Sequence, residues 1–260
     1  MLIDTHCHLD AAEFNADRDA VALSALQAGV KKIVIPAVER ANFDAVIAAC
    51  QRHPHCAFAL GVHPMYVDHA TEDDLATLQT YVAKHQPVAI GEIGLDYFVK
   101  NAKEHPAHIE KQLYFFTEQL KIANQFHLPV ILHVRNAIDD VLKYLRKAKV
   151  NGGIAHAFNG SFQQAEQLIA LGFKLGFGGA MTYSRALHIQ ALAKQLPLEA
   201  IVLETDSPDI PPEWLGRQAR NTPAQTVKVA QFLADLRQVN VSQVLDITSA
   251  NALQILPKLA

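Results

Sequence analysis

Two histidines separated by one residue, His6 and His8, end the first apolar run of the chain. In an extended strand alternate side chains share one face, so both imidazoles point the same way and Cys7 points the opposite way. Two imidazoles on one face are suited to bind a metal ion. A single His-x-His pair is as typical of ordinary polar residues at a strand end, so the interpretation depends on further ligands.

Short apolar runs rich in β-branched residues alternate with longer segments in which apolar residues recur three and four positions apart. Eight runs are predicted to be strands, at residues 2–5, 32–36, 57–62, 88–92, 130–134, 153–157, 173–177 and 200–205. The segments predicted to be helical are 17–28, 43–52, 72–84, 108–126, 137–148, 162–171 and 187–195. The pattern therefore predicts a repeated unit of one strand followed by one helix.

Eight such repeats in 260 residues predict a single (β/α)8 TIM barrel that spans residues 1–260, since this architecture typically takes about 250 residues. The main alternative is a doubly wound open sheet, which usually has a glycine-rich turn after its first strand. Here that turn reads His-Cys-His-Leu-Asp. The proline-containing loop of residues 206–222 follows the last strand and is long enough to form a functional lid.

In a TIM barrel the catalytic groups gather at the carboxyl ends of the strands. Histidines and carboxylates end six of the predicted strands: His6 and His8, His63, Glu92 and Asp96, His133, His156, and Glu204 and Asp206. This set is larger than one tetrahedral ion needs, which favours two divalent ions, with zinc, manganese or magnesium as candidates. A carboxylate can bridge two such ions, and Glu92 is our candidate for that bridge.

The composition restricts the partners of the protein. The net charge of −3 excludes a broad basic surface, so any nucleic-acid contact is local or assisted by bound cations. Cys7, Cys50 and Cys56 form no CxxC pair, which argues against disulfides and a thiolate zinc site. There is no apolar run of about 18 residues and no signal peptide, so we expect no membrane span and a cytoplasmic protein.

Seven motifs follow one another along the chain. They are His6-Cys-His8-Leu-Asp10 with Phe14 and Asp17, Gly61-Val-His63-Pro64, Gly91-Glu92-Ile-Gly-Leu-Asp96-Tyr97, Leu132-His133-Val-Arg135, His156-Ala-Phe158-Asn-Gly160, Glu204-Thr-Asp206-Ser-Pro208 and Arg220-Asn221. Together they resemble the TatD family of metal-dependent hydrolases over nearly the whole chain. The resemblance implies a TIM barrel of the amidohydrolase type, two divalent ions and a deoxyribonuclease activity.

The resemblance also implies a distribution of ligands. The first ion is placed on His6, His8, Glu92 and Asp206, and the second on Glu92, His133 and His156. No lysine ends the fourth or fifth strand, so a carbamylated lysine bridge is disfavoured. The chain departs from the TatD pattern at Ala157, Asn159 and Thr222, which affects substrate detail and no proposed ligand.

Other residues near the strand ends have candidate roles. Asp206 is the predicted catalytic base that takes a proton from the attacking water, with a turn-capping role as the alternative. His63 and Asp96 are expected to contact substrate or orient a ligand, or else to pack and cap turns. Arg135 and Arg220 are candidates for phosphate contacts, although surface ion pairing is the commoner fate of arginine.

Aromatic residues also follow the strands, and two or three of them could stack on bases, with packing inside the loops as the alternative. This group comprises Tyr66, Tyr97, Phe98, Phe158, Tyr183 and Trp214. The eight remaining histidines lie on predicted helices or outer loops and are expected to be solvated. They include His53, His55, His105, His108 and His188.

The favoured function is a dinuclear phosphodiesterase that trims DNA from a 3′ end. A dinuclear hydrolase of a carboxylic ester or amide, such as an aminoacyl ester on tRNA or a small metabolite, is the alternative, because the same activated water can attack a carbonyl. A metal-binding barrel without turnover is a third interpretation. The ligands do not distinguish between phosphorus and carbon as the electrophile, and no oligomeric state is predicted.

Overall fold

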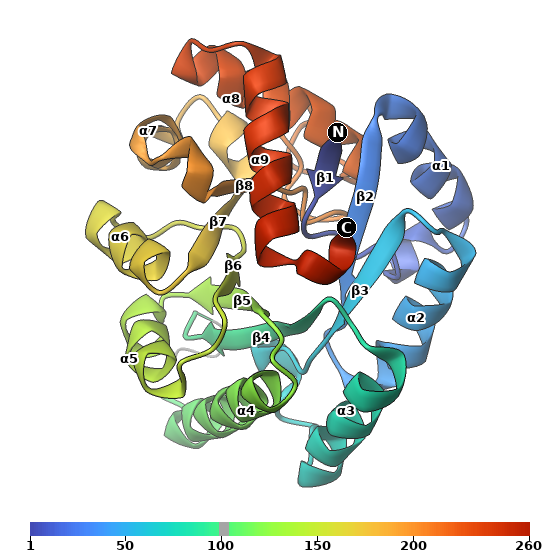
Figure 1. Cartoon of the computed structure of the whole chain (residues 1–260), viewed down its shortest axis with the longest axis vertical. Coiled ribbons are helices and arrows are strands. Elements are labelled where there is room, and N and C mark those ends of the chain that lie inside the picture. The colour runs from blue at the N-terminus through green and yellow to red at the C-terminus, as the bar shows by residue number, and fades with distance from the viewer. Residues whose placement is uncertain (99–103) are drawn as a thin grey trace.

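Eight parallel strands alternate with helices in the computed structural model, which describes residues 1–98 and 104–260. The strands are β1 (Leu2–Asp4), β2 (Val30–Pro36), β3 (Cys56–Leu60), β4 (Ala89–Asp96), β5 (Val130–Arg135), β6 (Gly153–Ala155), β7 (Phe173–Phe177) and β8 (Ile201–Leu203). Each strand pairs with the next one along the chain, without a reversal of order. This order excludes the doubly wound alternative and confirms the predicted (β/α)8 TIM barrel (Figure 1).

The helices form a ring around the strands (Figure 1). They are α1 (Arg18–Ala28), α2 (Phe43–Arg52), α3 (Glu72–His85), α4 (Pro106–Gln125), α5 (Ile138–Ala148), α6 (Phe162–Ala170), α7 (Leu187–Gln195), α8 (Thr226–Arg237) and α9 (Val241–Ile255). α5 illustrates why the helices pack around the strands. Its apolar residues Val141, Leu142 and Leu145 are buried on one face, as the helical period requires. Seven of these helices were predicted from the sequence, whereas α8 and α9 were not.

The strands are apolar because both of their faces are covered. In β2 the consecutive residues Ile33, Val34 and Ile35 are all fully buried. Their side chains alternate between the ring of helices and the barrel interior. Continuous burial of this kind distinguishes a parallel barrel from a sheet with one solvated face.

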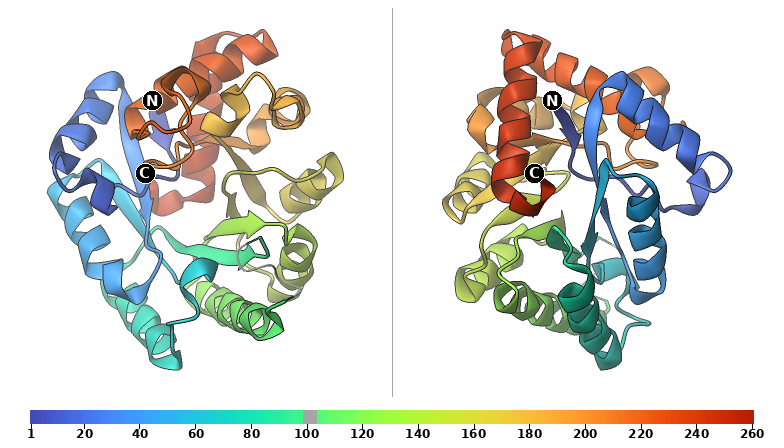
Figure 2. Two further views of the ribbon diagram at one scale, coloured as in Figure 1. Left: turned by 180° about the vertical axis from the view of Figure 1, so that it is seen from behind. Right: turned by 45° about the vertical axis from the view of Figure 1, so that its right-hand side comes forward.

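One end of the barrel interior, at the amino ends of the strands, is closed by α9. Figure 1 shows α9 in front of the strands, and the reverse view in Figure 2 places it behind them. We call this apolar cluster the amino-end plug. Its members include Ile3, Val34, Ala59, Ile131, Ile154 and Val202 from the strands, together with Ala252, Ile255, Leu256 and Leu259. The plug leaves the opposite end of the barrel for a functional site.

The first and last strands meet through a short set of backbone hydrogen bonds that we call the seam. The N–H of Thr5 donates to the carbonyl of Leu203 at 3.0 Å, and the N–H of Asp206 donates to that of His6 at 2.8 Å. The N–H of His8 donates to the carbonyl of Ser207 at 2.7 Å. The seam therefore closes the barrel at the residues that carry candidate ligands.

Several strands leave the regular ladder earlier than predicted, because their carboxyl ends turn toward the barrel axis. β6 ends at Ala155 and β8 at Leu203, and two residues soon after them, Ala157 and Asp206, have positive φ values of 45° and 56°. Non-glycine residues adopt this conformation rarely, and it is concentrated at functional sites. β4 is longer than predicted because it stays paired with β5 as far as Asp96.

The loop of residues 206–222, predicted as a lid, is fixed to the barrel. The side-chain amide of buried Asn221 donates to the carbonyls of Thr205, Asp209 and Ile210 at 2.9, 3.0 and 3.2 Å. Three such bonds hold the loop in place, so its described conformation is a wall of the site. Among the described residues, no helix has both the length and the apolar character needed to cross a membrane.

Candidate metal centre

Glu92 lies at the centre of the cluster at the carboxyl ends of the strands. Its side chain is 2% exposed, and β4 positions it inside the barrel mouth. One carboxylate oxygen, Oε2, lies 3.1 Å from His6 Nε2 and 3.4 Å from His8 Nε2. The other oxygen, Oε1, faces three more imidazoles, at 3.0 Å from His133 Nδ1, 3.4 Å from His63 Nε2 and 3.5 Å from His156 Nε2. The two oxygens thus face two separate sets of histidines.

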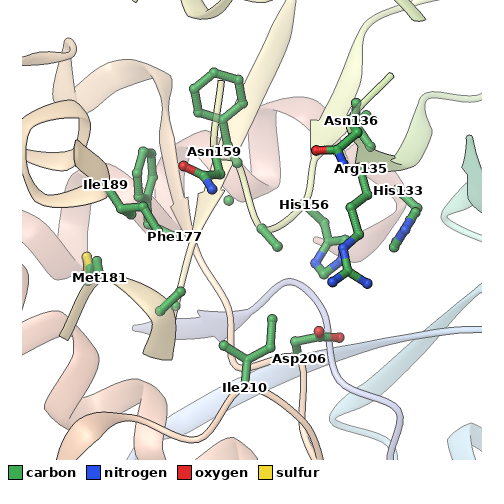
Figure 3. A pocket seen from close by; sticks show the side chains of 16 residues that line it. His133, Arg135, Asn136, His156, Asn159, Phe177, Met181, Ile189, Asp206 and Ile210 are labelled. Atoms are coloured by element: carbon green, nitrogen blue, oxygen red, sulfur yellow. The ribbon is translucent and has the colours of Figure 1, made fainter. Parts of the chain in front are cut away.

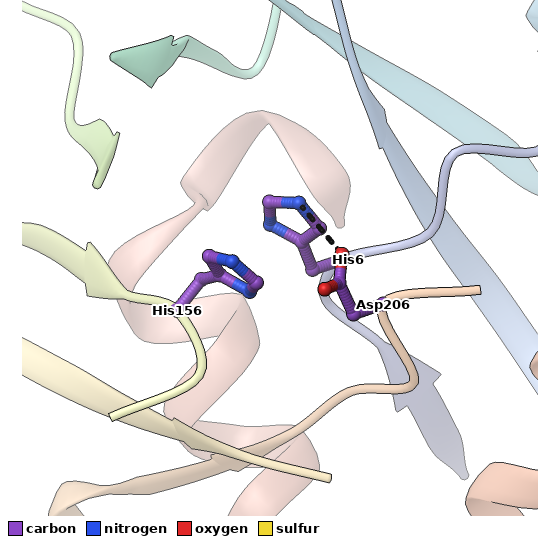
Figure 4. Close-up of side chains that lie close together, drawn as sticks. All are labelled: His6, His156 and Asp206. Carbon is purple, nitrogen blue, oxygen red and sulfur yellow. Dashed lines mark ion pairs between the residues drawn. The ribbon is translucent and has the colours of Figure 1, made fainter. Parts of the chain in front are cut away.

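Asp206 completes the first of these sets. Its Oδ1 atom lies 3.6 Å from Nε2 of both His6 and His8, which the seam holds beside it. The rings of His6 and His156 stack with centroids 3.8 Å apart, as Figure 4 shows together with the ion pair between His6 and Asp206. The backbone of Asp206 has a positive φ of 56°, a conformation that non-glycine residues adopt rarely.

The residues fit a divalent metal. His6 and His8 point their Nε2 atoms at one another across only 3.2 Å, with carboxylate oxygens on either side. Nitrogen and carboxylate lone pairs that converge in this way are the ligand set of zinc, manganese and similar ions. Within the described part of the chain, three groups have ligand atoms within 4.8 Å of one another: His6 with His8 and Glu92, His6 with His156 and Asp206, and His63 with Glu92 and His133.

The electrostatics of the cluster favour a bound cation. Burial alone would raise the pKa of the Glu92 carboxyl, but the imidazoles around it hold this pKa well below its ordinary value. Burial would lower the pKa of His8 and His156, but the carboxylates outweigh it and raise these pKa values to about 9 and about 10. The carboxylates therefore attract positive charge to this point, whether as protons or as metal ions.

Asp206 differs from Glu92 in its ionisation. Burial raises the pKa of the Asp206 carboxyl to about 6, against the opposing influence of His156 and His8. This pKa belongs to the site without a cation, and a cation bound beside the Asp206 carboxylate would lower it.

His133 is oriented by Asp96. Its Nε2 atom lies 2.9 Å from Asp96 Oδ2, while its Nδ1 atom faces Glu92. A carboxylate that accepts the N–H of one ring nitrogen leaves the lone pair of the other nitrogen for a metal. Asp96 is therefore placed where a residue that orients a ligand histidine would be.

Two buried glutamines of α4 hold the chain beside these residues. Oε1 of Gln112 accepts the N–H of Asp96 at 2.8 Å, and its Nε2 donates to the carbonyl of the same residue at 3.0 Å. Gln119 binds Val62, the neighbour of His63, in the same way at 2.7 and 3.0 Å. Each side-chain amide thus makes the two backbone hydrogen bonds that a neighbouring strand would otherwise make. Sequence reasoning missed both, because a glutamine on a helix usually faces solvent.

The expectation that His108 is solvated is wrong. His108 is 8% exposed, and its Nδ1 atom lies 2.6 Å from Asp68 Oδ1. Its Nε2 atom lies 2.8 Å from Nε2 of Gln112, which can only donate, so His108 accepts there and carries its proton on Nδ1. Satisfied polar contacts on both nitrogens make this burial stable. His53, His55 and His188 are at least partly exposed, and His105 is exposed.

Glu204 is a further residue of the site to which the sequence alone assigned no role. Its Oε1 atom accepts the N–H of Ala157 at 2.6 Å and lies 3.3 Å from His156 Nδ1, so Glu204 is placed to orient His156. Its close neighbour Gly176 leaves the required space, because a Cβ atom there would lie 2.1 Å from Glu204 Oε2. The spacing of Glu204 and Asp206, two residues apart at a strand end, was the available signal.

The two candidate arginines differ in position. Arg135 lines a cavity together with His133 and His156, and its guanidinium lies 3.7 Å from the centroid of the Phe98 ring. Arg220 is not among the residues that line the cavities at the cluster, and its guanidinium instead binds both carboxylate oxygens of Asp17, at 2.8 and 2.6 Å. Arg135 is thus the arginine that the structure brings to the cluster.

The match to known families agrees with this geometry. The model of the family described as TatD related DNase matches residues 3–257. The chain belongs to the TatD family. YjjV of Escherichia coli K12, named as a metal-dependent hydrolase, is 39% identical to this TatD protein over 239 residues, or 91% of this chain and 90% of YjjV. YabD of Bacillus subtilis strain 168, with the same description, is 33% identical over 254 residues, or 97% of each chain.

The fold of the TatD protein agrees with that of a solved relative. The crystal structure of YjjV, described as a TatD homologue, gives a TM-score of 0.92 at 36% identity and covers 98% of both chains. This protein is therefore a metal-dependent hydrolase of the TatD family, built as a TIM barrel.

Proposed function

We propose that this TatD protein is a phosphodiesterase that uses two divalent ions to remove nucleotides from the 3′ end of DNA. The observation that carries the proposal is the position of the Glu92 carboxylate between two groups of histidines. Its Oε2 atom faces His6 and His8, and its Oε1 atom faces His133 and His156. A carboxylate shared in this way is suited to bridge two ions. The description of the matching family as a DNase supports DNA as the substrate.

Each ligand has a place in this proposal. His6, His8, Glu92 and Asp206 would hold one ion, and Glu92, His133 and His156 would hold the other. Zinc, manganese and magnesium are the candidate metals. Ions bound there would polarise a phosphoryl oxygen and lower the pKa of an attacking water.

Side chains of the protein transfer the proton and bind the phosphate. Asp206, whose carboxylate lies beside the side chains of His6 and His8, accepts the proton of the attacking water and returns it to the leaving sugar oxygen. Arg135 binds a phosphate oxygen with a guanidinium that Phe98 holds in place. Asp96 and Glu204 keep the rings of His133 and His156 in orientation. His63 faces the same oxygen of Glu92 as His133, within reach of an ion or of the substrate.

A DNA oligonucleotide labelled at its 5′ end tests the reaction. We expect a ladder of products shortened from the 3′ end, which appears only with added divalent ions and disappears when the 3′-terminal linkage is replaced by a resistant analogue. Elemental analysis of the active protein should give two metal ions per chain. A uniform loss of the 5′ label, or cleavage without a divalent ion, would contradict the proposal.

The alternative electrophile is tested in the same assay. Carboxylic esters, aminoacyl ester analogues and amides are offered beside phosphodiesters under the same metal conditions. Turnover of the carbonyl compounds alone would identify the protein as a hydrolase of esters or amides and reject the nuclease assignment. Metal binding without turnover of any compound would favour a barrel that only binds metal.

A further inference from the structure

A cavity of about 450 Å³ opens directly from the metal centre toward β6, β7 and α7, and we call it the side cavity. His133, His156 and Asp206 form part of its wall, so a group that occupies it is attached to the group being hydrolysed. Figure 3 shows Arg135 beside His156, with Asn159, Phe177, Met181 and Ile189 farther away from them. The side cavity is thus a continuation of the reaction site.

The far part of the side cavity is apolar. Ile189 and Ile210 are partly exposed and line this space, whereas Phe158, Phe177 and Met181 are almost fully buried and contribute little surface to its wall. Aliphatic side chains of this kind offer dispersion contacts to a planar ring. A sugar or a phosphate, with polar groups on every side, would leave these walls poorly matched.

The near part of the cavity is polar. The side chain of Asn159 has no hydrogen-bond partner within residues 1–98 and 104–260, and it points into the cavity in Figure 3. An amide offers one acceptor and two donor hydrogens, which match the edge of a heterocycle. Arg135 stands at the junction with the metal centre, where its planar group is stacked on Phe98.

We propose that the side cavity binds the base of the nucleotide whose phosphate is cleaved, with Ile189 and Ile210 against its faces and Asn159 at its edge. This inference rests on the proposed phosphodiesterase function and adds a base-binding subsite to it. A cavity of about 450 Å³ has room for one nucleotide unit. A base held there is removed from the stack of its neighbours, so unpaired 3′ ends are better substrates than paired ones.

Two chromogenic diesters test the subsite: thymidine 5′-(p-nitrophenyl phosphate) and methyl p-nitrophenyl phosphate. Both release the same p-nitrophenolate, so the ratio of their kcat/KM values reports the contribution of the nucleoside. Binding of one base changes affinity by about 5-fold to more than 100-fold in nucleic-acid sites, so we expect a ratio of about 10 or more in the wild type. A wild-type ratio near one overturns the proposal.

Ile189→Trp fills the cavity and is the decisive variant, with Leu187→Trp as the matched control. Leu187 lies two residues away on the same helix, is 70% exposed and does not line the cavity. The Ile189→Trp ratio is expected to fall to near one, whereas Leu187→Trp keeps the wild-type ratio. An unchanged ratio in Ile189→Trp, or an equal fall in both variants, overturns the subsite.

Asn159→Ala gives a second test in case the larger substitution prevents folding, because Asn159 is exposed on a loop. Loss of one hydrogen bond to the base should lower the ratio about 2-fold to 10-fold, and no change would remove Asn159 from the subsite. Failure of the proposed function looks different: the wild type, loaded with divalent ions, would then hydrolyse neither diester.

Discussion

The two ends of the barrel interior are lined by the same eight strands and contain opposite kinds of side chain. At the amino ends, the amino-end plug brings residues such as Ile3, Val34 and Ile131 against Leu256, which follows α9. At the carboxyl ends, the interior holds Glu92 and Asp206 among histidines. Burying apolar groups stabilises the fold, whereas burying charges costs free energy unless each charge is paired. Stability and chemistry are thus assigned to different ends of one scaffold.

Glu92→Gln should produce the largest effect, because it removes the charge shared by both sets of histidines. We expect kcat/KM to fall more than about 100-fold and bound metal to fall below the wild-type content, since even residues that only support a ligand change activity 10-fold to 100-fold. Glu166→Gln, an exposed change on α6, is the control. Wild-type metal content and activity in Glu92→Gln would refute the central role of this carboxylate.

Leu256→Ala tests the opposite end. Leu256 is fully buried in the amino-end plug, so its truncation should lower the free energy of unfolding by about 2 to 5 kcal/mol. Urea denaturation measures this loss, and metal content and kcat at 25 °C should stay at wild-type levels. Gln254→Ala, at an exposed position of α9, provides the reference. A parallel loss of kcat would show that the two ends are not independent.

Protons and metal ions should compete at the carboxyl end only. Metal ligation needs neutral imidazoles, and the pKa values of His8 and His156 are raised to about 9 and about 10. Metal affinity should therefore rise between pH 6 and pH 8, by about 10-fold per pH unit for each proton released. Calorimetry with Zn²⁺ in buffers of different ionisation enthalpy counts these protons, and Leu256→Ala should give the same count. A pH-independent affinity would contradict the competition.

The same pKa shifts predict the stability of the metal-free protein. A histidine whose pKa is higher in the folded state than its ordinary 6.5 stabilises the fold fully below pH 6.5, and this contribution is lost as pH rises through the folded-state value. For His8 and His156 the loss falls between about pH 7 and pH 10. Thermal denaturation after chelation should show the melting temperature decreasing over this range, and a rise would oppose the assignment.

Gln112→Met should lower activity less than Glu92→Gln does, because Gln112 binds the backbone of Asp96 and the ring of His108 and none of the proposed metal ligands. Looser positioning of Asp96 and His133 is expected to lower kcat about 10-fold and to weaken metal binding, with KM nearly unchanged. Gln125→Met, an exposed change at the end of the same helix, is the control. Hydrogen exchange of the Asp96 amide gives a second readout, and unchanged exchange would remove Gln112 from this role.

The fold and the centre of the site could be predicted because both depend on local patterns. Alternation of apolar runs and helical segments defines the barrel, and a barrel collects the residues that end its strands. His6, Glu92 and His133 occupy such ends, so their assembly followed from position alone. The exact ends of strands β1, β6 and β8 could not be predicted from these patterns, because there the chain turns into the site.

The residues that sequence reasoning missed depend on distant partners. Gln112 and Gln119 are buried because each amide binds both polar groups of one backbone residue in another element. His108 is buried because Asp68 and Gln112 satisfy its nitrogens. α9 escaped prediction because it packs on the strands and also on α8, so its apolar residues do not form one narrow stripe. No local pattern encodes these partners.

The seam has a consequence for how the protein folds. Its hydrogen bonds join residues 198 to 200 positions apart, such as Thr5 and Leu203, and contacts between distant parts of a chain form slowly. Until they form, β1 and β8 are unpaired edge strands, which invite pairing with other molecules. A metal ion bound by His6, His8 and Asp206 would link the ends of these two strands. In a cell short of metal, the protein would therefore lose a safeguard against aggregation as well as its activity.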